Sequence, residues 1–418
     1  MLKWYFLFLG FTSAFSLSSW VPLVMALSIL LLAQLMHKVV LAKKIFINKS
    51  KVLILYSAFL MVVSCSFLFQ NYSIGFSNTG LNHTIAYFVV IFMYYGVVSL
   101  SLVNFKITNE KIFRFITYGV ILVSCFSIVE FLIKNFTGLP FDSWIPRIAG
   151  EDYNPIYFIG SSMIYRARGV MSESGYLALY LLMFLPLAFY YFNNVQKNKS
   201  KLYATSALIL TAVSVSFSSA GIAEFLIATS FTLLMVSLSA DFHIKINIKY
   251  VFALLFIIPL IILYLTYSDT NFSALSGIMD KITFVNDSGR FVRWEFAKDL
   301  FLSHPLLGQG PGISSILYGT GSTSFYLETL VETGIIGTTL FLSIMLYYLR
   351  IIFKIKDTVK YAYLFSYTVA VIHYFIISAF YLPWMWTLFA IISYTYHYER
   401  LNFPRATILK NNLSNLQK

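Results

Sequence analysis

Charged residues are scarce in this chain of 418 residues. They make up 11% of the sequence, whereas hydrophobic residues make up 59%, and a soluble domain is typically about 25% charged. This composition excludes an ordinary soluble protein, because the apolar side chains cannot all be hidden in one aqueous core. The apolar runs are about 20 residues long, which is the length of a membrane-spanning helix. They are continuous and do not alternate with polar residues, which excludes barrel strands.

Cysteine is nearly absent, and so are the motifs of nucleotide and metal chemistry. Cys65 and Cys125 both lie inside apolar runs, so they indicate neither a disulfide framework nor a zinc site. The sequence contains no P-loop, no dinucleotide fingerprint and no His-Glu-x-x-His motif. It also lacks an Asp-x-Asp pair, which would hold the metal of a nucleotide-sugar donor. We therefore expect no metal and no cofactor, and we expect any bound phosphate to be met by arginines.

The apolar runs predict an all-α polytopic protein with about twelve transmembrane helices, which form a single membrane domain over residues 1–418. A cleaved signal peptide is the alternative for the first run, but an uncleaved helix is favoured because a second run follows at once. The predicted spans are residues 4–18, 20–41, 52–70, 83–104, 113–134, 171–192, 202–219, 221–239, 250–268, 325–349, 361–380 and 383–398.

Basic residues outnumber acidic ones, with 30 Lys and Arg against 17 Asp and Glu. They gather in short loops, for example at Lys43, Lys106 and Arg350, and in the tail 399–418. The positive-inside rule places these segments and both termini in the cytoplasm. The basic excess is then topological and does not indicate a nucleic-acid partner.

Two long loops, 135–170 and 269–324, fall on the outer side in this topology. Long loops are usually functional. In the second loop, the amphipathic stretch 291–302 predicts a helix along the outer membrane surface. His304-Pro305 and the glycines that follow predict a helix end and a tight turn.

Arginines in both loops suit a phosphate ligand, because the guanidinium is a planar fork of five donors. Arg166 and Arg168 precede the sixth span, and Glu173 lies about one turn inside it, where an ionisable residue favours a functional role. Arg290 and Arg293 are three residues apart, which places both on one face of a helix. The structural alternatives are that Arg168 and Glu173 pair to anchor the loop, and that Arg290 and Arg293 contact lipid headgroups.

Other candidates flank the second loop. Trp294 can stack on a sugar ring or anchor the helix at the membrane interface. Glu328 and Glu332 share one face near the outer end of the tenth span, where either can be a base, the partner of a base, or the acceptor for the arginines. Glu224, just inside the eighth span, is a further acid at modest depth.

Together these residues resemble the O-antigen ligase and polymerase superfamily. The similar motifs are Arg290 with Trp294, the run His304-Pro-Leu-Leu-Gly-x-Gly-x-Gly312, and the helix start Tyr326-Leu-Glu-x-x-x-Glu-x-Gly334. Arg168-Gly169 with Glu173 is similar to an earlier segment of the family. The motifs cover roughly residues 160–340, and the number of spans is similar over the whole chain.

Two departures bear on the subtype. In the ligases the tenth span begins with a segment resembling His-Asn-x-Tyr-Leu, whereas this chain reads Thr323-Ser-Phe-Tyr-Leu327 and lacks the histidine. The turn at 217–221 lacks an arginine that is common in relatives. Both departures favour a polymerase over a ligase.

The resemblance implies a metal-independent glycosyltransferase, similar to the C type, in the bacterial inner membrane. Its donor and acceptor are expected to be undecaprenyl-pyrophosphate-linked glycans, which it joins into O-antigen or a related surface polysaccharide at the periplasmic face. Membrane lipid is an expected contact, and a chain-length regulator protein is a further candidate partner.

Within this interpretation Arg168, Arg290 and Arg293 stabilise the leaving pyrophosphate. Glu173 is the first candidate for the base that deprotonates the acceptor hydroxyl, with Glu328 and Glu332 as alternatives. The remaining expected substrate contacts are Arg166, Trp294 and Tyr326.

Two other functions stay open, namely a ligase that transfers glycan to lipid A core and a polysaccharide transporter or flippase. A transporter should show polar residues near mid-span, whereas the charges here gather at outer helix ends.

Overall fold

The computed structural model describes residues 1–18, 21–42, 46, 51–148, 156–159, 162–238 and 290–397. These residues are mostly helical, and seven of their helices are long and apolar enough to cross a membrane. The chain is therefore a polytopic membrane protein, which confirms the class predicted from its composition. The predicted span 250–268, the first part of the second long loop and the tail 399–418 lie outside the described residues.

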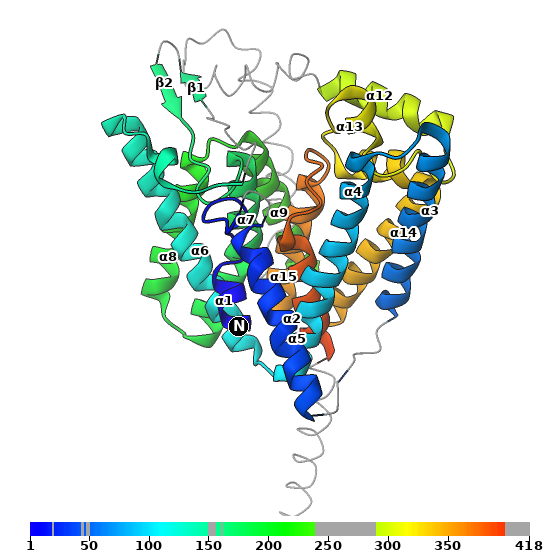
Figure 1. The fold of residues 1–418 in the computed structure, drawn as a ribbon. Helices are drawn as coiled ribbons and strands as arrows, with labels where there is room; N and C mark the ends of the chain where they lie inside the picture. The colour runs from blue at the N-terminus through cyan, green and yellow to red at the C-terminus, as the bar shows by residue number, and fades with distance from the viewer. Residues whose placement is uncertain are drawn as a thin grey trace, which may run out of the picture.

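The seven candidate spans run lengthwise through the bundle (Figure 1). They are α2 (Leu23–Ala42), α3 (Val52–Ile74), the continuous helix of α4 (Asn78–Val89), η1 (Val90–Val97) and α5 (Val98–Phe105), α6 (Asn109–Leu132) with η2 (Ile133–Thr137), α7 (Ser174–Tyr190) with η4 (Tyr191–Val195), α9 (Ser219–Leu238), and α14 (Phe325–Lys354). Three shorter helices pack among them, namely α8 (Lys199–Val215), α15 (Val359–His373) and a helix at 383–397.

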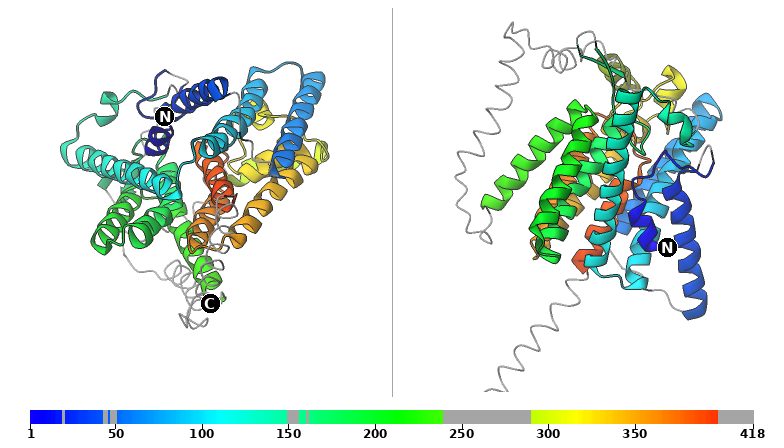
Figure 2. Two further views of the ribbon diagram at one scale, coloured as in Figure 1. Left: turned by 90° about the horizontal axis from the view of Figure 1, so that it is seen from below. Right: turned by 90° about the vertical axis from the view of Figure 1, so that its left-hand side faces the viewer.

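The helix at 383–397 lies near the middle of the bundle, where the view along the helices shows it in red (Figure 2). Trp384 and Trp386 on this helix are fully buried. Their indole N–H groups donate to the backbone carbonyls of Leu9 at 3.0 Å and Phe380 at 2.8 Å. Burial of large rings whose polar atoms have partners is what a dense core requires, so this helix organises the packing around it.

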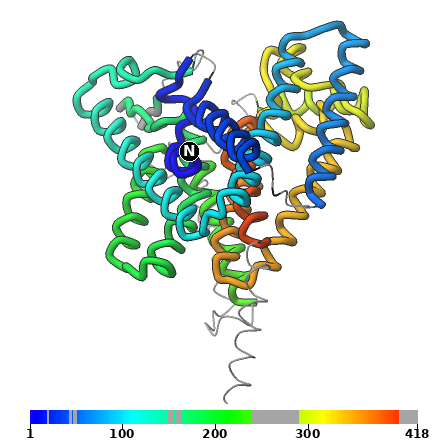
Figure 3. Tube along the Cα trace, turned by 60° about the horizontal axis from the view of Figure 1, so that its bottom comes forward, coloured from blue at the N-terminus to red at the C-terminus, as the bar shows by residue number. Residues whose placement is uncertain are grey.

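The helices form two groups. One contains α3, α4 and α14, the other contains α6, α7 and α8, and α15 lies between them (Figure 3). α15 packs against α7, α9 and α14. The segment that leaves α15 is therefore in a position to contact both groups.

The first predicted span, 4–18, was wrong as a spanning helix. α1 (Leu2–Leu7) has only six residues, and the chain then turns. The backbone N–H groups of Ser13 and Ala14 donate to the Val170 carbonyl at 3.2 and 3.1 Å, and that of Phe15 donates to Pro146 at 2.8 Å. These bonds to the first long loop take the place of further helical bonds, so the apolar run packs against the loop instead of continuing as a helix.

The described parts of both long loops lie at one end of the bundle, which we call the loop end (Figure 1). The first contributes η3 (Phe141–Trp144) and an antiparallel hairpin of β1 (Ile156–Ile159) and β2 (Ser162–Tyr165), in which Ile156 pairs with Tyr165. The second contributes α12 (Arg290–Ser303) and α13 (Ile313–Tyr318). α12 lies across the ends of α3 and α14 (Figure 1), which confirms the helix predicted at 291–302.

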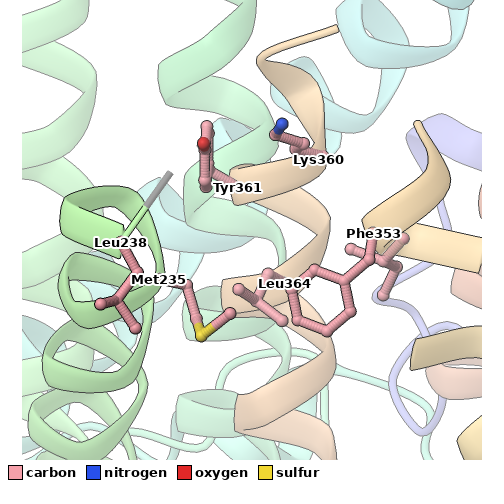
Figure 4. A pocket seen from close by; sticks show the side chains of 7 residues that line it. Met235, Leu238, Phe353, Lys360, Tyr361 and Leu364 are labelled. Atoms are coloured by element: carbon pink, nitrogen blue, oxygen red, sulfur yellow. The ribbon is translucent and has the colours of Figure 1, made fainter. Parts of the chain in front are cut away.

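A cavity of about 130 Å³ lies between α9, α14 and α15 (Figure 4). Its lining residues include Met235, Phe353, Lys360 and Tyr361. These residues lie at the end of α9, the end of α14 and the start of α15, and so at the end of the bundle opposite the loops. The cavity is therefore separate from the predicted site residues, which all belong to the loop end.

Candidate active site

Three helix ends meet at the loop end, namely the start of α7, the start of α9 and the end of α15. Glycine permits one of the contacts, because a Cβ atom placed on Gly221 would lie 2.8 Å from the Ala178 Cβ atom. At Gly175 a Cβ atom would meet Ile377 Cδ1 at 3.7 Å, which is an ordinary van der Waals contact. The residues that begin α7 are thus held against both α9 and the segment that follows α15.

Glu173 precedes the first residue of α7 and has an extended backbone, with φ −133° and ψ 154°. Its side chain is exposed and makes no cap hydrogen bond. The surrounding protein still removes enough water to raise the pKa of Glu173, although the charges of Arg166, His373 and Arg290 oppose that shift. Glu173 is therefore within electrostatic reach of residues from three other segments, as a base beside an anion site would be.

Arg166 and Arg290 approach Glu173 from different loops. The Arg166 Nε atom donates to the Ser216 carbonyl at 2.9 Å, which fixes its guanidinium beside the turn between α8 and α9. Arg290 begins α12, and Arg293 lies one turn further on. Partial removal from water and the nearby charge of Arg293 lower the pKa of Arg290, while Glu173 opposes this. Neither Arg290 nor Arg293 has an ion-pair partner among the described residues.

Arg168 lies elsewhere, in a buried cluster of charges that the sequence analysis did not identify. Its Nη2 atom bonds to Asp142 Oδ1 at 2.9 Å, and its Nη1 atom donates to the Ser172 carbonyl at 3.4 Å. Glu130 is fully buried and accepts the backbone N–H groups of Arg168 at 3.1 Å and Gly169 at 2.5 Å. Arg168 thereby holds the backbone next to Glu173.

Two further cations complete this cluster. Lys134 bonds to Glu130 Oε1 at 3.0 Å and pairs with Asp142. The Arg147 guanidinium bonds to the carbonyls of Met171 at 2.7 Å and Gly169 at 2.8 Å. Burial would raise the pKa of Asp142, but the hydrogen bonds and charges of Lys134 and Arg168 hold it below its ordinary value. Glu130 and Lys134, four apart in a predicted span, were a signal for this cluster.

Glu332, like Arg168, stabilises the fold through its side-chain contacts. His83 Nδ1 and the Gly312 N–H contact its Oε1 atom at 3.0 and 2.5 Å, and the Tyr87 hydroxyl donates to its Oε2 atom at 2.7 Å. The carboxylate is fully buried and holds the glycine-rich turn that follows α12. Glu332 is thus occupied by contacts within the protein.

Glu328 and Tyr326 lie near this turn on α14. The Ser322 N–H donates to Glu328 Oε2 at 2.7 Å, while Glu328 Oε1 is buried without a hydrogen-bond partner. The Tyr326 hydroxyl donates to the Val371 carbonyl at 3.1 Å, which joins α14 to α15. Trp294 stays partly exposed and meets Phe291 edge to face at 5.6 Å. The structure does not link these three residues to Glu173.

A buried pair joins α15 to α9, and the sequence analysis did not predict it. His373 Nδ1 and Glu224 Oε1 are 2.6 Å apart, and both side chains are fully buried. Glu224 was noted as an acid near a helix start, but the eleventh span gave no signal for its histidine partner. No group of three or more His, Cys, Asp or Glu residues in the described part of the chain has the arrangement of a metal site.

A family model described as O-antigen ligase matches residues 204–342. This segment is similar to the O-antigen ligase family. It contains Glu224, Arg290, Arg293, Glu328 and Glu332, and it supports the resemblance to the O-antigen ligase and polymerase superfamily. No curated protein matches the chain.

Proposed function

We propose that this protein polymerises undecaprenyl-pyrophosphate-linked oligosaccharide units into a surface polysaccharide. The observation that supports this most directly is that the charges of Arg166 and Arg290, which come from two different loops, both act on Glu173 at the loop end. A carboxylate beside arginines that come from two loops suits a reaction in which a hydroxyl attacks a sugar and a pyrophosphate leaves. The predicted topology places the loop end at the periplasmic face.

In the proposed reaction, the acceptor hydroxyl gives its proton to Glu173 as its oxygen bonds to the anomeric carbon of the donor. The bond between that carbon and the phosphate oxygen breaks, and its electron pair leaves with undecaprenyl pyrophosphate. Arg290 and Arg166 face the developing negative charge, and Arg293 adds a second cation on α12. Fixed donors in a site with little water stabilise such charge effectively.

Arg168 acts as a positioning residue in this scheme. Its bonds to Asp142 and to the Ser172 carbonyl fix the loop segment that carries Glu173. The position of α12 depends in turn on Ala297 and Leu300, which pack on Ile313 and Val331. Two structural clusters, one per loop, therefore support the two halves of the proposed site.

A ligase is the second candidate, and the description of the matching family favours it. In a ligase the acceptor is the core of lipid A, and the same base and arginines serve the same bond change. The chain lacks the ligase histidine at 323–324, which is why we place the polymerase first.

The test is a gel of surface polysaccharide from cells that lack the protein, complemented with wild type, Arg290→Ala or Glu173→Ala. We expect the null cells to carry lipid core with one repeat unit. Wild type should restore the ladder, and each variant should lose at least about tenfold in long product, because general base catalysis contributes about 10²–10⁴-fold. Lys298→Ala, an exposed residue on α12, is the control and should restore the ladder.

The other outcomes separate the alternatives. Bare core with polymer retained on undecaprenyl pyrophosphate indicates a ligase. Units that remain on the inner side of the membrane indicate a flippase. A full ladder with both variants contradicts the assignment of Glu173 and Arg290, whatever the reaction is.

A further inference from the structure

In the described part of the chain, apolar side chains line two recesses of the helix surface. The larger, of about 780 Å³, lies between α2, α3 and the helix that contains η1, and no charged residue lines it. The smaller is the cavity of about 130 Å³ between α9, α14 and α15, at the end opposite the loops. Of the two, only the smaller combines apolar walls with a charged residue, so only it can distinguish one lipid headgroup from another.

The smaller cavity has the size and the lining of a site for a hydrocarbon segment. Met235, Ile352, Phe353 and Leu364 form its walls. A cavity of about 150 Å³ lined by Leu, Ile and Phe stays dry and binds small apolar molecules such as benzene. Phe353 is 46% exposed, so the cavity is not sealed and a lipid tail can enter it from the bilayer.

The charged residue is Lys360, at the start of α15. Figure 4 shows Lys360 and Tyr361 together at one end of the cavity, with Met235, Leu364 and Phe353 further along. The Lys360 Nζ atom lies 5.1 Å from the centroid of the Tyr361 ring, which is within the range of a cation–π contact. The site is therefore amphipathic, with an ammonium group at one end and hydrocarbon at the other.

Lys360 is part of a basic surface at this end of the bundle. Residues 350–360 contain one acid, Asp357, and four basic residues, namely Arg350, Lys354, Lys356 and Lys360. The Asp357 Oδ1 atom accepts the Tyr190 hydroxyl at 2.9 Å and the Val359 N–H at 3.1 Å, so this acid fixes the start of α15. No acidic residue lines the cavity. The charge pattern therefore favours an anionic ligand.

The depth of the site matches that of a phospholipid headgroup. α14 ends at Lys354 and α15 begins at Val359, so Lys360 lies where two helices meet the membrane surface. Tyrosine, here Tyr361, is typical of that interface. The predicted topology places this end at the cytoplasmic face, where basic pockets between membrane helices bind anionic headgroups.

We propose that the cavity between α9, α14 and α15 binds one anionic phospholipid of the cytoplasmic leaflet. Its phosphate lies at Lys360, and one acyl chain begins against Met235, Leu364 and Phe353. The lipid stabilises the protein, because it binds the native arrangement of the three helices and not the unfolded chain. The site does not depend on the proposed function, because it lies at the other end of the bundle from Glu173 and the arginines.

The experiment is a thermal melt of the full-length protein in detergent micelles, with native mass spectrometry to count bound lipid. The probes are phosphatidylglycerol, phosphatidylcholine with identical acyl chains, and inorganic phosphate. We expect phosphatidylglycerol to raise the melting temperature and to remain bound as a single molecule per protein. The other two should do neither, because phosphatidylcholine has no net charge and phosphate has no apolar part.

Three variants make the result specific. Lys360→Gln should weaken the binding of phosphatidylglycerol about fivefold, which is the contribution of one basic residue near an anionic membrane surface. Lys354→Gln is the matched control, because it removes the same charge from an exposed position that does not line the cavity, and it should bind nearly as wild type does. Met235→Trp fills the apolar part and should abolish the effect of the lipid, which preserves the test if Lys360→Gln does not fold.

Two results would overturn the proposed lipid site. Equal losses of binding in Lys360→Gln and Lys354→Gln would show that a diffuse basic surface attracts the lipid. Equal melting temperatures with phosphatidylglycerol, with phosphatidylcholine and without lipid would show that no phospholipid binds the cavity specifically. Neither result changes the polymerase proposal, which the polysaccharide gel tests separately.

Discussion

Arg168 lies in the first long loop, just before α7, and Arg290 is the first residue of α12 in the second loop. The two arginines have different roles in the fold. Arg168 is 3% exposed and bonded to Asp142 and to a backbone carbonyl. Arg290 is exposed and has no ion-pair partner among the described residues. The same side chain thus stabilises a loop in one place and remains available for a phosphate in the other.

Substitution by lysine should separate these two uses. Lysine is a point charge that cannot bond to Asp142 and Ser172 with one planar fork. We expect Arg168→Lys to lower the melting temperature of the purified protein, since lysine keeps the charge but loses one of the two hydrogen bonds, and a hydrogen bond to a charged group contributes about 1.5–3 kcal/mol. Arg290→Lys should melt as wild type does and retain part of its activity. A normal melting temperature for Arg168→Lys would show that the buried cluster contributes little to the fold.

The sequence identified the types of residue at the site better than their partners. Arg166, Glu173 and Arg290 were predicted from arginine chemistry and from acids at helix starts, and the charges of both arginines act on the Glu173 carboxyl. The contacts of Arg168 with Glu130 and Asp142 join residues that are 38 and 26 positions apart, and no local sequence pattern predicts such pairings. His373 was missed because a lone histidine in an apolar run gives no sign of the glutamate opposite it.

The break in α14 shows how one residue shapes a helix and the turn that packs on it. Gly334 interrupts the helix with φ 64° and ψ −167°. The N–H groups of Ile335 and Ile336 then donate to Pro305 at 2.9 Å and Leu306 at 3.3 Å. The run from His304 to Gly312 therefore docks into the break, and Glu332 closes it from the other side.

Gly334→Ala tests this arrangement. A Cβ atom there would lie 2.2 Å from the Leu306 carbonyl oxygen, and a positive φ costs a residue with a side chain about 1–2 kcal/mol. We expect the turn to separate from α14, with faster hydrogen exchange at 305–312 and loss of product. Gly75→Ala is the matched control, because its φ is 87° but nothing lies within 4 Å of the new atom. Equal effects of the two variants would mean that backbone strain alone matters.

Helices were predicted correctly where hydrophobicity determines the structure. They were predicted wrongly where a local turn interrupts an apolar run. The long apolar runs became α2, α3, α6 and α14, and the amphipathic run became α12. The apolar run at 4–18 did not become a span, because three consecutive N–H groups bond to the first loop instead. The kink at Gly334 was not predicted, because the run 325–349 was taken as one continuous helix. Gly334 was nevertheless the last residue of the motif that begins at Tyr326.

The arrangement of the whole molecule predicts which side of the membrane each end of the bundle faces. The loop end carries the proposed site, whereas short basic segments such as 197–201 and 354–360 lie at the opposite end. Cytoplasmic loops are enriched in Lys and Arg. The loop end should therefore face the periplasm, where a lipid-linked donor is met without a nucleotide.

Single cysteines can test this orientation, since the chain has only Cys65 and Cys125 to remove. Thr320 at the loop end and Ser200 at the opposite end are both exposed. With both native cysteines replaced by alanine, we expect an impermeant thiol reagent to label Thr320→Cys in cells with a permeable outer membrane. Ser200→Cys should react only after the inner membrane is opened. The reverse pattern would place the arginines and Glu173 in the cytoplasm, where they could not act on glycan at the outer face. The proposed polymerase would then be wrong.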